Sequence, residues 1–298
     1  MDDDDYILRI CVFLICVLSG IWFYRHQNEN GTILQEAFSQ REPFVFKEEN
    51  SVYDLFYINQ YDDLYKTKSY SEDDMVVIDT LTKPSLNDNS FLDVGCGSGS
   101  LLSLLETRNY NSFGIDKSPA MVNQAKQTAV DSEILCDDVL RDPMLFENNS
   151  FSHILCTHFT IYEIEDKTTF FNHCFHWLKP SGFLVLHVVD PDNFNMIVPK
   201  SELYNHVNKR IMNTELNTDG FVYTNQFKTS QKEIFVQEEK FQTKNKIRQN
   251  SKTWYLTGKK TLCQTAVTCG FDLHSESVYD KGAIRDKNQF LIIFVKPN

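Results

Sequence analysis

Five short apolar runs alternate with polar segments of helical length in the first two thirds of the chain. Runs of this length, bounded by turn residues, are typical of strands buried on both faces of a parallel sheet. A polar residue stands at or just after the end of most of them. The alternation of strands with helices predicts an α/β fold with a doubly wound sheet. The runs are 91–94, 113–116, 134–138, 151–159 and 182–189.

The pattern changes after the fifth run. Three segments rich in β-forming residues follow each other with only polar turns between them, which predicts an antiparallel insert within about residues 200–256. A helix is then expected at 257–269, with Gly270 as its C-terminal signal. The last two apolar segments predict the closing strands, the final one antiparallel. The insert segments are 220–229, 233–243 and 246–256, and the closing strands are 273–279 and 290–295.

A tyrosine repeats at every fourth position in the segment 52–67. This spacing places the four rings, Tyr53, Tyr57, Tyr61 and Tyr65, on one face of a predicted helix. The stripe either packs the helix onto the sheet or forms a lid over a ligand. Under the second interpretation, Tyr57 or Tyr61 is the expected neighbour of the ligand.

The segment 7–24 is apolar over eighteen residues and contains one charge, Arg9. This length is close to the roughly 20 residues that a membrane-spanning helix needs. An acidic start and the lack of a small-residue cleavage site argue against a secretory signal peptide. We expect residues 1–26 to be an uncleaved single-pass anchor, 27–50 a tether and 51–298 the main domain, facing the cytosol. The alternative is a buried helix.

The composition narrows the choice of partners. A net charge of −12 and a pI near 5.1 argue against a broad nucleic-acid footprint, which needs clustered Lys and Arg. The eight cysteines include no C-x-x-C pair, so no zinc site or other metal site is expected. They are interpreted as reduced, buried side chains.

The first apolar run leads directly into a glycine loop with Gly95, Gly97 and Gly99, and Asp93 precedes it by two residues. Strand, glycine loop and helix together let the backbone approach a nucleoside ligand closely. The second strand ends at Asp116, where a carboxylate can accept hydrogen bonds from both ribose hydroxyls. The third acidic tip, Asp137-Asp138, can reach an adenine amino group.

Five motifs in order resemble the class I S-adenosylmethionine-dependent methyltransferases. The resemblance implies a seven-stranded, mostly parallel sheet and S-adenosylmethionine as cofactor. Asp93 and the three loop glycines would line the methionine part, Asp116 the ribose and Asp137 the adenine. The predicted cofactor-binding set further contains Cys96, Lys117, Asp138 and Thr157. The motifs are LDVGCGSG (92–99), GIDKSPAMV (114–122), LCDDV (135–139), SFSHILCTHF (150–159) and WLKPSGFLVLHV (177–188).

Two positions depart from the family pattern: His153 stands where an acid is usual, and Cys136 where a glycine is usual. Neither lies in the glycine loop. The competing interpretation is a nicotinamide or flavin site, but that fingerprint requires a third glycine at position 100, where this chain has Ser100.

Methyl transfer is a direct displacement, so catalysis depends mainly on alignment, with a general base when the acceptor carries a proton. His158 and Tyr162, which follow the fourth strand, are the predicted catalytic residues, and Glu163, His187 and Asp190 are further candidates. The alternative for His158 is a packed histidine without a catalytic role.

The acceptor is less constrained. The segment THFTIY (157–162) lacks the Asn-Pro-Pro-Tyr pattern of relatives that methylate nucleobase or glutamine nitrogens. Together with the acidic charge, this favours a small-molecule, lipid-like or peptide acceptor, and nucleic acid is not expected. The alternative function is a non-catalytic, membrane-tethered module that binds the cofactor or another protein. The intact glycine loop and Asp116 argue against that alternative.

Overall fold

The computed structural model describes residues 44–193, 213–218, 220–279 and 286–298. The predicted membrane segment at 7–24 lies outside the described residues, as does most of the predicted tether. Within the described ranges, no helix combines the length and the apolar character that crossing a membrane requires.

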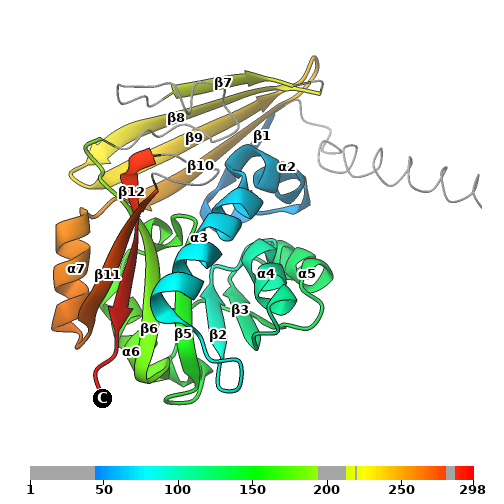
Figure 1. Ribbon diagram of the computed structural model, residues 1–298. Coiled ribbons are helices and arrows are strands. Elements are labelled where there is room, and N and C mark those ends of the chain that lie inside the picture. The colour runs from blue at the N-terminus through cyan, green and yellow to red at the C-terminus, as the bar shows by residue number, and fades with distance from the viewer. Residues whose placement is uncertain (1–43, 194–212, 219, 280–285) are drawn as a thin grey trace, which may run out of the picture. The chain divides into compact units, whose positions relative to one another are not determined.

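A seven-stranded sheet forms the centre of the fold (Figure 1). Its strand order is β11-β12-β6-β5-β2-β3-β4, and only β12 runs against its neighbours. All five apolar runs and both closing strands of the sequence prediction are strands of this sheet. They are β2 (Phe91–Val94), β3 (Ser112–Asp116), β4 (Glu133–Cys136), β5 (Phe151–Cys156), β6 (Leu178–Val189), β11 (Asp272–Tyr279) and β12 (Asp286–Val295).

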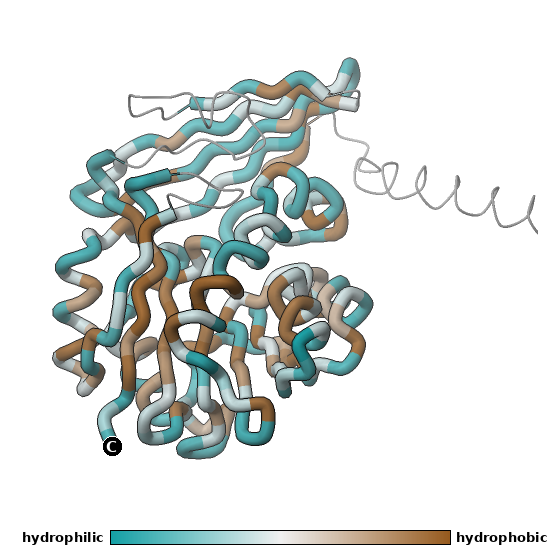
Figure 2. Tube along the Cα trace, viewed as in Figure 1, coloured by the Kyte–Doolittle hydropathy of each residue, from teal (hydrophilic) through white to brown (hydrophobic). Residues whose placement is uncertain are grey.

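Helices cover both faces of this sheet, as the crossover connections of a parallel sheet require. One layer contains α3 (Thr67–Thr82), α4 (Ser100–Thr107) and α5 (Pro119–Thr128), and the other contains α6 (Lys167–Trp177) and α7 (Lys259–Thr268). The central strands β2, β5 and β6 are mostly apolar and buried, and Figure 2 shows apolar residues concentrated in this part of the sheet. Burial of these strands from both sides explains why hydropathy alone located them.

A second sheet of five strands contains the predicted insert (Figure 1). The three predicted antiparallel strands are confirmed, but the sequence prediction missed the two edge strands, β1 and β7. The order is β1 (Phe44–Glu48), β10 (Ile247–Tyr255), β9 (Ile234–Gln242), β8 (Val222–Gln231) and β7 (Asn213–Asn217), with β1 parallel to β10.

The position of β1 changes the expected domain boundary. The segment 44–48 was assigned to the tether, yet each of its residues pairs with β10, from Phe44 with Ile247 to Glu48 with Ser251. A five-residue edge strand carries too little pattern to be distinguished from a polar linker. Residues 44–48 therefore belong to the same compact unit, Phe44–Asn298, as the rest of the second sheet.

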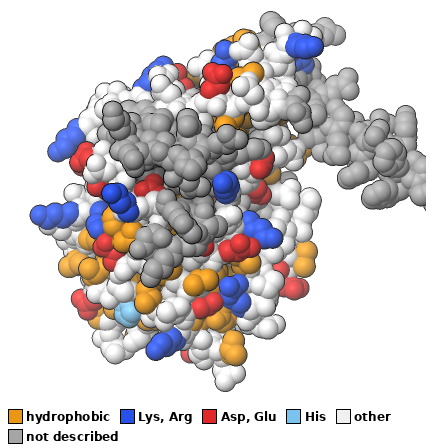
Figure 3. Space-filling model, turned by 45° about the horizontal axis from the view of Figure 1, so that its top comes forward, with side chains coloured by type: hydrophobic (Ala, Val, Ile, Leu, Met, Phe, Trp, Pro, Cys, Tyr) orange, Lys and Arg blue, Asp and Glu red, His pale blue; other side chains and the backbone are white. Residues whose placement is uncertain are grey.

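Helix α2 (Leu55–Tyr65) packs on the inner face of the second sheet. The ring of Phe56 lies edge-on to Phe241, with centroids 5.1 Å apart, and Arg248 reaches Asp54, the N-cap of this helix, at 2.8 Å. On the face shown in Figure 3, Lys and Arg side chains lie among Asp and Glu side chains, with hydrophobic side chains between them.

Candidate functional site

A cavity opens where β2, β3, β4 and β5 end, at the carboxyl edge of the central sheet. It contains about 720 Å³ of empty space, which includes the solvent-filled mouth. Residues from the glycine loop, three strand tips and the segment before α2 form its wall. The lining residues are Tyr53, Tyr61, Val94, Gly95, Gly97, Ile115, Asp116, Lys117, Met121, Asp137, Asp138, Val139, His158, Thr160, Glu163 and Ile164.

The three loop glycines are needed for different reasons, although all have positive φ angles. A Cβ at Gly95 would lie 2.5 Å from Thr160 Cγ2, and one at Gly99 would lie 3.0 Å from Ala125 Cα. A Cβ at Gly97 would meet nothing nearer than the Gly95 carbonyl oxygen at 3.9 Å. Gly97 therefore leaves ligand volume free, whereas Gly95 and Gly99 allow close packing of the protein itself.

Asp116 is held rigidly at the tip of β3. Its Oδ2 accepts the N–H of Gly97 at 3.0 Å and its Oδ1 accepts the N–H of Ser118 at 2.8 Å. Burial raises the pKa of this carboxyl, and the two backbone hydrogen bonds partly oppose that effect. Each oxygen keeps further acceptor capacity on the cavity side, so the pair of oxygens suits two neighbouring hydroxyl groups.

The tip of β4 forms the next part of the wall. Asp137 pairs with Arg141 at 2.6 Å, and Asp138 accepts the N–H of Leu140 at 2.9 Å. The apolar side chains of Met121 and Val139 line the same cavity. A flat apolar ring with polar edges fits between such groups, because aliphatic side chains cover its faces and carboxylates accept from its edge.

Several predicted cofactor-binding residues do not line the cavity: Asp93, Cys96, Gly99 and Thr157. They support the loop instead; Thr157, for example, accepts the N–H of Thr160 through its carbonyl oxygen at 3.0 Å. Burial, followed by the charge of Asp116, raises the pKa of Asp93 to about 8. Their direct contact with a cofactor stays a prediction.

The two predicted catalytic residues occupy different environments. His158 lines the cavity, with its Nε2 3.3 Å from Ser71 Oγ, and burial lowers its pKa to about 4, so the imidazole is neutral at neutral pH. Tyr162 does not line the cavity. It is fully buried, and its hydroxyl oxygen accepts the N–H of Val189 at 2.8 Å, which ties the 3-10 helix η3 (Thr160–Glu163) to β6.

The tyrosine stripe is divided between two environments. Tyr53 and Tyr61 line the cavity, whereas the hydroxyls of Tyr57 and Tyr65 donate to Glu239 Oε1 at 2.9 and 3.1 Å. The stripe is thus both a packing surface and part of the cavity wall. Of the two expected ligand neighbours, Tyr61 lies on the wall and Tyr57 does not.

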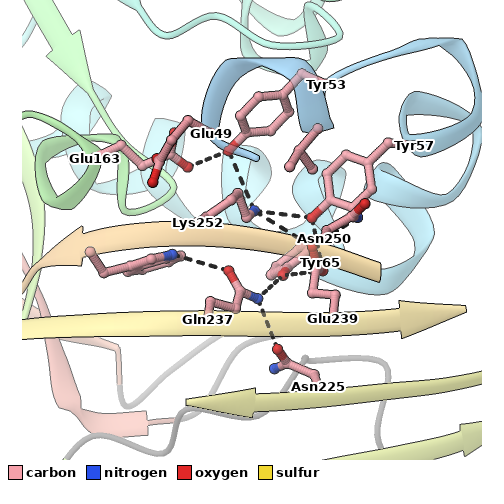
Figure 4. A network of polar contacts seen from close by, with 12 residues as sticks. Glu49, Tyr53, Tyr57, Tyr65, Glu163, Asn225, Gln237, Glu239, Asn250 and Lys252 are labelled. Carbon is pink, nitrogen blue, oxygen red and sulfur yellow. Dashed lines mark hydrogen bonds and ion pairs between the residues drawn. The ribbon is translucent and has the colours of Figure 1, made fainter. Parts of the chain in front are cut away.

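No pattern in the sequence predicted the polar network that joins this helix to the second sheet (Figure 4). Glu239 and Lys252 are buried on the inner face of the second sheet, 3.9 Å apart. Lys252 Nζ donates to Tyr57 at 3.0 Å and to Tyr53 at 3.4 Å, and Tyr53 donates to Glu163 on the cavity wall. Charged residues in a strand normally indicate a solvated face, so their partners were required to recognise this network.

A protein-family profile described as a methyltransferase domain matches residues 91–182. Phosphoethanolamine N-methyltransferase 1 of Triticum aestivum is 34% identical over 98 residues, which are 32% of this chain. This chain covers only 20% of that protein's length, and 19% of a second Triticum aestivum phosphoethanolamine N-methyltransferase, 32% identical.

Solved structures share the fold over most of this chain. An S-adenosylmethionine-dependent methyltransferase from Clostridium acetobutylicum superposes with a TM-score of 0.62 and 14% identity, covering 80% of this chain and 97% of its own. The CcbJ methyltransferase from Streptomyces caelestis superposes with a TM-score of 0.64 and 12% identity, covering 84% of this chain and 100% of its own. CalS10 from Micromonospora echinaspora is an amino pentose methyltransferase with S-adenosylmethionine bound. It superposes with a TM-score of 0.58 and 18% identity, covering 80% of this chain and 96% of its own. At these identities the likeness shows the fold.

Proposed function

We infer that this chain is a class I S-adenosylmethionine-dependent methyltransferase that methylates a small acceptor. The family profile and the shared fold support this class and this cofactor. The observation that carries the inference is the geometry of Asp116, fixed by two backbone N–H groups beside Gly97 at the cavity wall. An unrelated α/β domain has no need of a rigid carboxylate next to an open glycine turn.

The residues present fit the cofactor part by part. Asp116 would hold the ribose hydroxyls, and Asp137, Asp138, Met121 and Val139 would surround the adenine. The open space over Gly97 leaves room for the remaining part. The cofactor supplies a methyl group activated by a sulfonium. The side chains past β5, among them the neutral imidazole of His158, would orient the acceptor.

Calorimetric titration of S-adenosylhomocysteine into the purified protein tests this function. We expect binding, and a loss of affinity of roughly 10- to 100-fold in Asp116→Ala, because hydrogen bonds to a charged group contribute about 1.5–3 kcal/mol. Asp131→Ala, at an exposed acid distant from the cavity lining, is the matched control and should bind like the wild type. A folded wild-type protein that does not bind would refute the proposal.

The acceptor itself is proposed as a small molecule, a lipid-like molecule or a peptide. Relatives and structural neighbours are named for phosphoethanolamine, an amino pentose and a glycopeptide, which supports an acceptor of modest size.

We also propose that residues 7–24 anchor the enzyme in a membrane, with the catalytic domain in the cytosol. The apolar length of this segment supports the anchor, and the expected cytosolic supply of S-adenosylmethionine supports the orientation. In cells, the full chain should resist carbonate extraction and dissolve in detergent, and a chain lacking residues 1–26 should be released. Neither sequon, Asn30 or Asn148, should be glycosylated. Glycan at either site would refute the orientation, and carbonate release of the full chain would refute the anchor.

A further inference from the structure

Glu163 lies on the cavity wall, and only one of its two carboxylate oxygens accepts a hydrogen bond from the described residues. Its Oε1 accepts the hydroxyl of Tyr53, and it makes no other hydrogen bond or ion pair within the described residues. The residue is half-buried and lines the cavity at the end of η3. A carboxylate has acceptor capacity on both oxygens, so Oε2 is available to a donor that enters the cavity.

The second sheet holds this carboxylate in place (Figure 4). The Lys252 ammonium donates to the Tyr53 hydroxyl at 3.4 Å, so the Tyr53 proton is directed to Glu163. Lys252 is in turn fixed by Tyr57 at 3.0 Å and by Glu239 at 3.9 Å. This chain of contacts positions Glu163 before any ligand arrives, which lowers the cost of binding.

Two aromatic rings stand beside the carboxylate. Tyr53 and Tyr61 both line the cavity, with centroids 6.2 Å apart and planes at 75°. Electron-rich ring faces attract cations, and a carboxylate among them strengthens that preference. The same cluster already accommodates a cation on its far side, because Lys252 Nζ lies 5.0 Å from the Tyr53 ring and 5.1 Å from the Tyr57 ring.

The charges around the cavity also favour a cationic ligand. Four carboxylates line it, Asp116, Asp137, Asp138 and Glu163, against Lys117 as the single Lys or Arg among the lining residues. The three aspartates accept protein N–H groups or, in the case of Asp137, pair with Arg141. Within the described residues the Glu163 side chain has only the neutral Tyr53 hydroxyl as a partner, so a cationic group beside it is favoured and an anionic one is disfavoured.

We propose that the acceptor is an amine, held with its nitrogen between Glu163 and the rings of Tyr53 and Tyr61. This rests on the proposed methyltransferase function. The neutral nitrogen forms the new N–C bond with its lone pair as the methyl–sulfur bond breaks and that pair returns to sulfur. The positive charge passes to nitrogen, facing the carboxylate and the ring faces, and the nitrogen then releases its N–H proton to Glu163 or water.

Competition between a cation and its neutral isostere tests the proposal without knowledge of the acceptor. The full chain is saturated with S-adenosylhomocysteine, and calorimetry measures binding of benzylamine against benzyl alcohol and of choline against dimethylbutanol. We expect at least one cation to bind tenfold or more tightly than its isostere. The two cation–isostere pairs differ in shape, so the result does not depend on whether one of the molecules is too large or too wide to enter the cavity.

The variants locate the preference. Glu163→Gln should reduce the preference for the cation to threefold or less, with unchanged affinity for S-adenosylhomocysteine. Glu165→Gln, at an exposed acid that only accepts the Tyr255 hydroxyl, should keep the preference. Equal binding of cation and isostere, no binding of either cation, or a preference that survives in Glu163→Gln would overturn the amine proposal. Lack of S-adenosylhomocysteine binding would instead overturn the function on which it rests.

Discussion

Replacing Asp74 with asparagine is expected to stabilise the protein at neutral and alkaline pH. Asp74, on α3, is fully buried. The Tyr279 hydroxyl donates to its Oδ1, and its Oδ2 has no hydrogen-bond partner among the described residues. The nearest charged or titratable partner of Oδ2 is His158 Nε2, at 4.0 Å. Burial raises the pKa of Asp74 to about 8, so this carboxyl keeps its proton in the folded protein at pH 7.

The sign of the pH dependence follows from this direction. The pKa of Asp74 is about 8 in the folded state and about 4 in the unfolded chain, so the folded state binds the proton more tightly. The contribution of the Asp74 proton to the free energy of unfolding is fully present below about pH 4. As the pH rises it falls by up to about 1.4 kcal/mol per pH unit, and it is lost above about pH 8. Asparagine has no proton to lose. The free energy of unfolding of Asp74→Asn, measured relative to that of the wild type, should therefore increase by up to about 4 kcal/mol between pH 4 and pH 7.

Urea unfolding at several pH values between 4 and 9 measures this effect. Asp93, whose pKa is also raised to about 8, is present in both proteins and contributes the same slope to each. Glu72→Gln, at an exposed acid of the same helix, should leave the slope unchanged. If the free energy of unfolding changes with pH in the same way for the wild type and for Asp74→Asn, Asp74 titrates normally and the prediction is contradicted.

Asp54→Asn should destabilise the protein by about 3 kcal/mol, since it leaves a buried cation without its counter-charge. Arg248 is 1% exposed, and its Nη1 contacts both Asp54 oxygens at 2.9 and 2.8 Å. Lys47 also lies 3.6 Å from this carboxylate. Asparagine keeps the N-cap acceptor for Tyr57 N–H, so the change isolates the charge.

Denaturation at pH 7 measures this loss, and an exposed ion pair of the same sheet provides the control. Lys228 and Glu238 lie 2.6 Å apart with 50% and 32% of their side chains exposed, so Glu238→Gln should cost less than 1 kcal/mol. Arg248→Met should cost less than Asp54→Asn, because the remaining carboxylate is 34% exposed and water can solvate it. Equal losses in Asp54→Asn and Glu238→Gln would refute the argument.

The cofactor half of the site followed closely from the sequence. Gly95, Gly97, Asp116 and Asp137 lie on the cavity wall because a parallel sheet brings the carboxyl ends of its strands to one edge. Each strand is marked locally by an apolar run and each tip by a polar residue. Such information is local, so a single sequence contains it.

The cluster around Glu163, proposed here to hold the acceptor, depends on contacts that no local pattern records. Glu163, Tyr53 and Lys252 lie far apart in the chain and meet only because α2 packs on the second sheet. Tyr57 and Tyr61 share one helical face, yet only Tyr61 reaches the cavity.

The sequence by itself thus determined the α/β class, the strand runs, the glycine loop and the acidic strand tips. The tertiary structure decided which tyrosines line the cavity, that the Tyr162 hydroxyl accepts the N–H of Val189, and that Glu239 and Lys252 are buried. The physical reason is that hydropathy and spacing are properties of neighbouring residues. The surroundings of a charged or aromatic side chain are set by partners that folding brings from elsewhere in the chain.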